Sequence, residues 1–161
     1  SLIPKKYMDL IFRNPKRFWI CASIDAVGKR YEWIRGTPWK KTNQTLKELY
    51  YQTGVKPTIT PILSSYNINS TTSLDNWASE SEWIDIEATK SIGGYYKNLV
   101  HGPDWCNPQK VFTQKQINII KDLPFPIKSE YNKHAFEKHI KYTKVMNKVR
   151  GFEIDIWNDM K

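Results

Sequence analysis

The pattern of apolar and polar positions predicts helices and strands in alternation along the 161-residue chain. Residues 4–13 place apolar side chains on one face at helical spacing, and Asn14-Pro15 ends that helix. Residues 18–24 are apolar on both faces, which is the pattern of a buried parallel strand. A second helix begins at Pro38 and runs to about residue 51, and Gly54 follows it at a C-cap position.

The second half of the chain continues this alternation. Residues 56–69 predict a strand in which Pro61 marks a bulge or an early edge. Polar residues 69–73 precede a helix over 74–83. Apolar and polar residues alternate weakly over 83–92, which predicts a third strand. Residues 93–110 are predicted to be a loop. The fold class is therefore α/β with parallel strands, and the strands at 18–24 and 58–64 should be neighbours.

Two further helices are expected near the C-terminus. Thr113 and Gln116 form a capping-box pattern before Ile117 and Ile120. The last helix runs from about residue 130 to 150, and Gly151 closes it. Its apolar side is predicted to consist of Ala135, Phe136, Ile140, Val145, Met146 and Val149.

Composition narrows the possible partners. The formal net charge is +9 and aromatic residues make up 14% of the chain, so the chain can bury a core and attract an anionic partner. A basic surface with no polyanionic partner is the alternative. No apolar run is long enough to span a membrane and the N-terminal residues lack the apolar core of a signal peptide, so a cytoplasmic location is expected.

Polar side chains follow both predicted strands, where ligands of parallel α/β folds bind. Ser23 and Asp25 end the first strand, with Arg35 further along the chain, and Ser65 and Asn67 end the second. These groups suit ribose hydroxyls, amino groups and carboxylates. The same residue types also favour ordinary turns, so the turn interpretation stays open.

Residues 23–36, SIDAVGKRYEWIRG, resemble the stretch that follows the fourth barrel strand in radical S-adenosylmethionine enzymes. The similar branch comes from phages and environmental sequences and has a shortened, twitch-type C-terminal region. Ala26 and Trp33 stand where that branch has Gly and Tyr. Weaker similarities follow in order along the chain, in ITPILSSYNI (59–68), DLPFPIK (122–128) and NKVRG (147–151).

The resemblance implies a partial TIM-type barrel over residues 1–92 and a C-terminal loop and helical extension over 93–161. It implies that S-adenosylmethionine is bound by Ser23, Asp25, Arg35, Ser65 and Asn67. The family holds its [4Fe–4S] cluster on a Cys-x3-Cys-x2-Cys motif, which this sequence does not contain. The cluster is therefore expected only in a missing N-terminal half, which becomes the expected partner. Alone, the chain should be inactive toward its peptide or small-molecule substrate.

The alternative function is a non-catalytic, basic nucleic-acid-binding module. Residues 128–150 carry seven Lys or Arg against two acids, with Tyr131, Phe136 and Tyr142 between them. The same pattern is also expected of a solvated helix face over an apolar stripe, or of a helix that binds an acidic substrate.

No metal site is expected from the remaining polar residues. His134 and His139 are five residues apart and do not share a helix face, and His101 falls in a loop. Cys21 is predicted to be buried in the first strand, far in sequence from Cys106. Glu32 is expected to brace Arg30 or Arg35.

Overall fold

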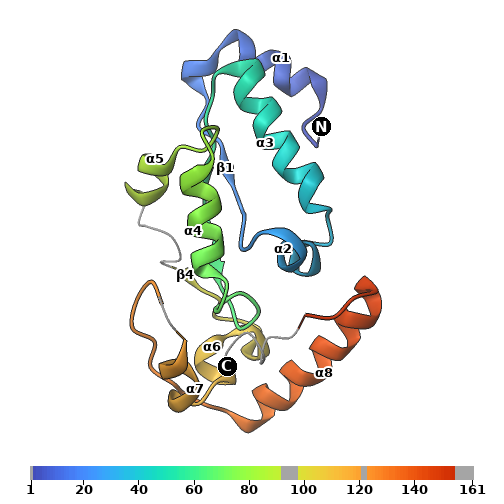
Figure 1. Cartoon of the computed structure of the whole chain (residues 1–161), viewed down its shortest axis with the longest axis vertical. Coiled ribbons are helices and arrows are strands. Elements are labelled where there is room, and N and C mark those ends of the chain that lie inside the picture. Colours follow the sequence, from blue (N-terminus) through green and yellow to red (C-terminus); the bar gives the residue numbers. More distant parts are fainter. Residues whose placement is uncertain (1, 92–97, 121–122, 155–161) are drawn as a thin grey trace.

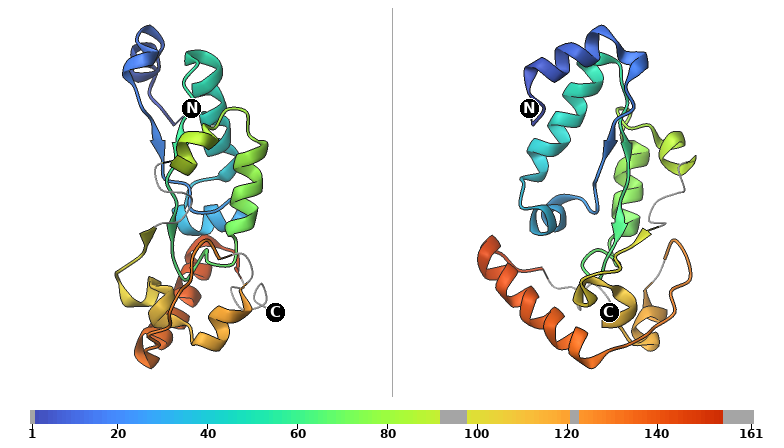
Figure 2. Two further views of the ribbon diagram at one scale, coloured as in Figure 1. Left: turned by 90° about the vertical axis from the view of Figure 1, so that its left-hand side faces the viewer. Right: turned by 180° about the vertical axis from the view of Figure 1, so that it is seen from behind.

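The computed structural model describes residues 2–91, 98–120 and 123–154. The molecule is elongated, and helices α1 (Lys5–Arg13) and α8 (Lys133–Arg150) lie at its opposite ends (Figure 1). The other two views in Figure 2 show the same separation. Short strands and the remaining helices fill the space between these ends.

The N-terminal helices form where the sequence predicts them. Helix α1 is followed by a 3-10 turn, η1 (Pro15–Arg17), and by α3 (Trp39–Thr53) after an intervening strand and helix. Met8 and Ile11 of α1 pack against Leu49 of α3 in a small core of their own. Gly54 ends α3 in the left-handed conformation, with φ at 72°, as its C-cap position predicts.

Helix α2 (Gly28–Arg35) was not expected, because its polar and aromatic residues show no clear helical period. Gly28 has a φ of 58° and begins the helix instead of forming a separate turn, and Gly36 ends the helix with a φ of 71°. Tertiary contacts hold the helix in place: Thr42 of α3 donates a hydrogen bond to the Tyr31 hydroxyl at 3.2 Å. The helix therefore forms because its aromatic residues, including the buried Trp33, pack against the rest of the protein.

The strands are short and parallel. Strand β1 (Cys21–Ala22) pairs with β2 (Thr58–Ile59), which confirms that the first two predicted strands are parallel neighbours. Strand β3 (Ile62–Leu63) follows β2 closely and pairs with β4 (Asn98–Leu99), also in parallel. Pro61 separates β2 from β3, as its place within the predicted strand suggested. The fold is thus mixed α/β with small parallel sheets, and the described residues form no closed barrel.

The first strand is covered on one face only, so the prediction that it is buried on both faces was wrong. Phe18 and Ile20 pack against the small N-terminal core, whereas Trp19 is 66% exposed. Cys21 and Ser23 are also exposed, which corrects the expectation of a buried Cys21. Side chains alternate along a strand, and here the helices cover only one of the two resulting faces. We call the uncovered side of β1, marked by Trp19, Cys21 and Ser23, the open face.

The helices after the second strand differ from the predicted order. Helix α4 (Thr71–Glu80) starts earlier than expected, and residues 86–91 form a helix, α5 (Ile86–Ser91), where a third strand was predicted. The Asp85 carboxylate accepts a hydrogen bond from the Ala88 N–H at 2.9 Å, which is N-cap geometry and favours the helix. The strand that pairs with β3 is β4, within the predicted loop. Residues 92–97 of that region lie outside the described residues.

The C-terminal part joins the main core. After η2 (Asp104–Cys106), α6 (Pro108–Val111) and α7 (Gln114–Ile119) contribute Val111 and Ile117 to the core that also contains Leu63 and Leu74. The capping box at Thr113 and Gln116 is present in both of its hydrogen bonds, as predicted.

Helix α8 has a different buried face from the predicted one. Ala135 and His139 are its buried residues, while Val145 and Val149 are 52% and 66% exposed. The predicted apolar side was wrong for these two valines because Met146, Asn147 and Arg150 are the residues of this part of α8 that contact the rest of the protein. Gly151 ends α8 in the left-handed conformation, as expected.

The C-terminal end of α8 is fixed to α2. The Trp33 indole N–H donates to the Asn147 side-chain oxygen at 2.8 Å, and Arg150 donates to the Trp33 carbonyl at 3.0 Å. The Arg150 guanidinium lies directly over Gly36, where a Cβ atom would meet it at 2.6 Å. Among the helices of the described residues, none has the length and apolar character needed to cross a membrane.

Candidate functional site

A cavity of about 320 Å³ lies where the strands end and α8 crosses them. Asp25 and Arg35 come to it from the segment after β1, Ile62 and Tyr66 from β3 and its following turn, and Tyr142 from α8. The sequence separations are large, so only the tertiary fold brings these side chains together. The parallel strands point their carboxyl ends toward this cavity, as ligand sites in α/β folds require.

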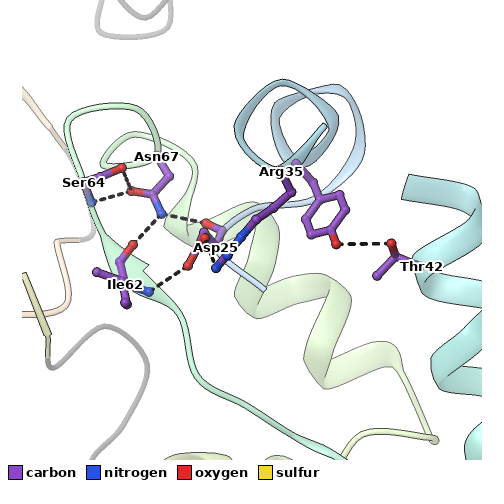
Figure 3. Close-up of polar contacts among 7 residues, drawn as sticks. Asp25, Arg35, Thr42, Ile62, Ser64 and Asn67 are labelled. Carbon is purple, nitrogen blue, oxygen red and sulfur yellow. Dashed lines mark hydrogen bonds and ion pairs between the residues drawn. The ribbon is translucent and has the colours of Figure 1, made fainter. Parts of the chain in front are cut away.

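Asp25 and Arg35 form an ion pair at the wall of this cavity (Figure 3). The Arg35 Nη2 lies 2.5 Å from one carboxylate oxygen of Asp25, and the other oxygen accepts a hydrogen bond from the Ile62 N–H at 2.9 Å. The side chain of Asp25 is 9% exposed and that of Arg35 is 36% exposed. Asp25 therefore holds the guanidinium in place, while Arg35 still presents part of its side chain to the cavity.

Asn67 is fully buried and does not line the cavity. Its side-chain oxygen accepts from the Ser64 N–H at 2.7 Å and from the Ser64 hydroxyl at 3.0 Å. Its amide nitrogen donates to the carbonyls of Asp25 at 2.8 Å and of Ile62 at 2.9 Å. Two accepted and two donated bonds use the full capacity of an amide side chain. Asn67 thus joins the two strand ends, as Figure 3 shows, and its amide is occupied by the protein itself.

Ser65 points away from this cavity, toward a buried histidine. Its hydroxyl donates to the Trp105 carbonyl at 3.1 Å and lies 3.2 Å from Nδ1 of His139. His139 is fully buried on α8 and stacks on Tyr66, with ring centroids 4.7 Å apart. Burial lowers the pKa of His139 to about 4, so this imidazole is neutral at neutral pH. The contacts of His139 with Ser65 and Tyr66 hold α8 against the turn that follows β3.

Ser23 lies on the open face and does not line the cavity. Of the five residues predicted to contact a cofactor, Asp25 and Arg35 therefore reach the cavity wall. Asn67, Ser65 and Ser23 do not line it.

Other polar groups near the site have structural partners. Arg30 donates to the Tyr66 carbonyl at 2.8 Å and to the Asn69 side chain at 2.9 Å, so it ties α2 to the turn after β3. Glu32 accepts from the Trp39 N–H at 3.0 Å and pairs with Lys29 at 3.1 Å. The hydrogen bond from Trp39, with Lys29, lowers the pKa of Glu32. Glu32 is thus a structural brace, but its cationic partner is Lys29 and neither arginine.

Cys106 brings a thiol to the cavity. Burial raises the pKa of its thiol to about 11, so the thiol is protonated at neutral pH. A protonated thiol is a poor nucleophile and a poor metal ligand.

The α8 residues at the cavity, Tyr142 and Met146, were not identified as site residues from the sequence. Their approach to Asp25 and Arg35 depends on the angle at which α8 crosses the strand ends, and no local pattern encodes that angle. The sequence signal for Tyr142 as a site residue was the presence of an aromatic residue among the lysines of α8.

Searches against protein-family models, curated proteins and solved structures found no match for this chain. The interpretation of the site therefore depends on its own chemistry. A cavity with aromatic and aliphatic walls and one partly exposed guanidinium suits a small ligand that carries a carboxylate.

Proposed function

We propose that this chain is the C-terminal portion of a radical S-adenosylmethionine-type enzyme, and that its strand-end cavity supplies contacts to S-adenosylmethionine and to the substrate. The observation that carries the proposal is the Asp25–Arg35 pair in a cavity at the carboxyl ends of parallel strands. The resemblance of residues 23–36 to the family places the same two residues at that position.

Arg35 is the proposed partner of the ligand carboxylate. A guanidinium carries five N–H donors in a planar fork, and Asp25 engages only one end of it. Asp25 acts as a positioning residue, because both of its oxygens are engaged by Arg35 and by the Ile62 N–H. The aromatic residues Trp33 and Tyr66 give the cavity the apolar walls that a nucleoside would contact.

The open face supports the idea of a missing half. A strand with the sequence FWICA is apolar enough to be buried on both sides, yet Trp19 is 66% exposed. Burial of a large apolar side chain stabilises an interface by about 1.5–3 kcal/mol. The remainder of a barrel, from a separate polypeptide or from a longer chain, would cover this face.

The iron–sulfur cluster does not fit the residues of this chain. The family motif needs three cysteine thiolates, and the chain has two cysteines, on β1 and in η2. In the family the cluster supplies the electron that cleaves S-adenosylmethionine. We propose that the missing half holds it and that this chain holds and orients the bound ligands.

The alternative, a nucleic-acid-binding module, is supported by the exposed lysines of α8. That surface also exposes the aliphatic side chains of α8. A protein does not need exposed aliphatic side chains to bind a phosphate backbone, because charge supplies that affinity.

The experiment is coexpression, under anaerobic conditions, with the reading frame directly upstream when that frame encodes Cys-x3-Cys-x2-Cys. We expect a brown complex of the two polypeptides that binds S-adenosylmethionine. Trp19→Glu should prevent association, because it places a charge in the proposed interface. The matched control is Phe12→Glu, because Phe12 is 65% exposed and belongs to α1 and not to β1.

Association that tolerates Trp19→Glu as well as Phe12→Glu would remove the open face from the interface. The absence of any complex with a cluster-bearing half would contradict the proposed function.

A further inference from the structure

Helix α8 carries two parallel rows of exposed side chains, and one member of these rows, Tyr142, also lines the strand-end cavity. The first row, which we call the apolar row, consists of Tyr142, Val145 and Val149, exposed to 39%, 52% and 66%. The second, the lysine row, consists of Lys141, Lys144 and Lys148, all exposed. Each lysine directly precedes a member of the apolar row. Both rows follow the i, i+3, i+7 spacing of one helix face, so they run side by side for about 10 Å.

A shallow pocket of about 300 Å³ lies at the N-terminal end of the apolar row. It is lined by Trp105, Lys138, Lys141, Tyr142 and Val145, so aromatic and aliphatic atoms form its walls. The Lys138 ammonium lies 5.3 Å from the centre of the Trp105 ring. One large apolar side chain of a partner could enter here beside two positive charges.

Within the described residues, no carboxylate pairs with the lysines of this surface. Glu137 is the single acidic residue of α8, and it pairs with Lys133 at 3.9 Å. Within the described residues, Lys138 and the three members of the lysine row form no salt bridge with a carboxylate. The surface therefore combines unpaired charge of one sign with exposed apolar area, and exposed apolar area of this kind marks interaction sites.

We propose that the apolar row, the lysine row and the Trp105 pocket form a docking site for an acidic, amphipathic helical segment of a partner protein. Apolar side chains one and two turns apart on such a segment match the spacing of the apolar row. Acidic residues beside them meet the lysine row, which forms no salt bridge within the described residues, since Glu137 pairs with Lys133. This proposal goes beyond the proposed function and does not depend on it.

Two other anionic partners fit the surface less well. Single-stranded nucleic acid stacks its bases on flat aromatic rings; Trp105 and Tyr142 offer such rings at one end of the surface, whereas Val145 and Val149 offer none. An anionic membrane takes up a broad apolar helix face, whereas the opposite face of α8 is packed against the protein through Ala135 and His139. Both are included as outcomes of the test.

The test uses the whole chain and a fluorescein-labelled synthetic peptide of Glu, Ala and Leu. Its leucines lie at i, i+4 and i+7 and its glutamates on the flanks. A scrambled peptide of the same composition has its leucines spread around the helix. By fluorescence anisotropy, we expect the patterned peptide to bind about tenfold more tightly than the scrambled one, a difference of about 1.4 kcal/mol. Binding should weaken as salt screens the charges.

Variants separate the two rows. Val145→Ser with Val149→Ser should abolish the preference for the patterned peptide. Lys141→Gln with Lys144→Gln should weaken both peptides and reduce the salt dependence. The matched control, Lys40→Gln with Lys115→Gln, removes two exposed lysines from α3 and α7 and should change nothing.

Equal binding of the two peptides, or a patterned peptide unaffected by the valine changes, would overturn the proposal. Tighter binding of oligo(dT) or of phosphatidylserine vesicles than of the patterned peptide would also overturn it, in favour of nucleic acid or of a membrane surface.

Discussion

The strand-end cavity and the outer surface of α8 handle charge in opposite ways. In the cavity, Asp25 is buried and fully engaged by Arg35 and the Ile62 N–H, and Asn67 uses all four of its hydrogen-bonding positions. On α8, the lysine row is exposed and forms no salt bridge within the described residues. The first region is organised before any ligand arrives, whereas the second offers charge and apolar area that only a partner can satisfy.

This difference has consequences for stability and for binding. Buried polar groups that are fully paired fix a geometry, and removal of one leaves its partners unsatisfied. Exposed charges contribute little to folding and act mainly on association, in a way that salt weakens. Changes in the cavity should therefore reduce the free energy of unfolding, and changes on α8 should reduce binding.

The largest expected effect comes from Asn67→Ala. Four hydrogen bonds are lost and the N–H and carbonyl groups of the strand ends stay buried, so the free energy of unfolding should fall by about 3–4 kcal/mol. Urea denaturation measures this change. Asn67→Asp keeps an accepting oxygen but turns a carboxylate oxygen toward the buried carbonyls of Asp25 and Ile62, so it should lose at least as much.

The matched control is Asn118→Ala, at an exposed residue that accepts one hydrogen bond from Gln114. A loss at Asn67 no greater than at Asn118 would show that the amide of Asn67 does not hold the strand ends together.

The next effect is a dependence of stability on pH that arises from His139. Burial lowers its folded-state pKa from 6.5 to about 4, so the folded protein disfavours the protonated form. The stability contributed by the neutral imidazole is complete above pH 6.5 and is lost as the pH falls toward 4. The loss amounts to about 3 kcal/mol over that interval, at about 1.4 kcal/mol per pH unit.

Urea denaturation of the wild type and of His139→Gln, at several pH values, isolates this contribution, because the carboxylates titrate equally in both. His134→Gln, at an exposed position on the same helix, is the control and should keep the wild-type profile. Identical profiles for wild type and His139→Gln would contradict a buried, neutral His139.

A smaller effect is expected from Gly36→Ala. The left-handed φ of 71° strains any other residue by about 1 kcal/mol, and the new methyl group would displace the Arg150 guanidinium from Trp33. The sum should be about 2 kcal/mol. Gly54→Ala has the same φ, 72°, with no atom within 4 Å of the new Cβ, and should cost only the strain. Equal losses at the two glycines would mean that Arg150 does not fasten α8 to α2.

The smallest effect should come from the outer surface of α8. Lys144→Gln and Val149→Ser remove exposed groups that no described contact uses for folding, so each should change the free energy of unfolding by less than about 0.5 kcal/mol. Thermal or urea denaturation checks this. A loss above 1 kcal/mol would make the two rows part of the fold.

The sequence predicts the local features of this molecule better than its long-range ones. The helix over 4–13, the capping box at Thr113 and the glycine ends at Gly54 and Gly151 follow from nearby residues. Helix α2 and the exposure of the odd-numbered residues of the first strand depend on what packs against them. A pattern of apolar residues shows that a strand can be buried, but it does not show whether a neighbour is present to bury it.

The same limit applies to the candidate site. Polar residues after a strand identified Asp25 and Arg35 as candidates near the strand ends, but not the ion pair between them. The roles of Asn67 and Ser65 depend on which backbone groups of distant segments need partners. Tyr142 comes to the cavity through the crossing of α8, more than 100 residues after Asp25.

The most direct test of the central claim is the affinity for S-adenosylmethionine of the complex with the cluster-bearing half, measured by equilibrium dialysis with Arg35→Met. The account predicts a loss of about ten- to a hundredfold, since the ligand carboxylate would lose its charged partner. Arg13→Met, at an exposed residue of α1, should bind as the wild type does. Unchanged affinity in Arg35→Met would contradict the proposal that this cavity holds the ligand.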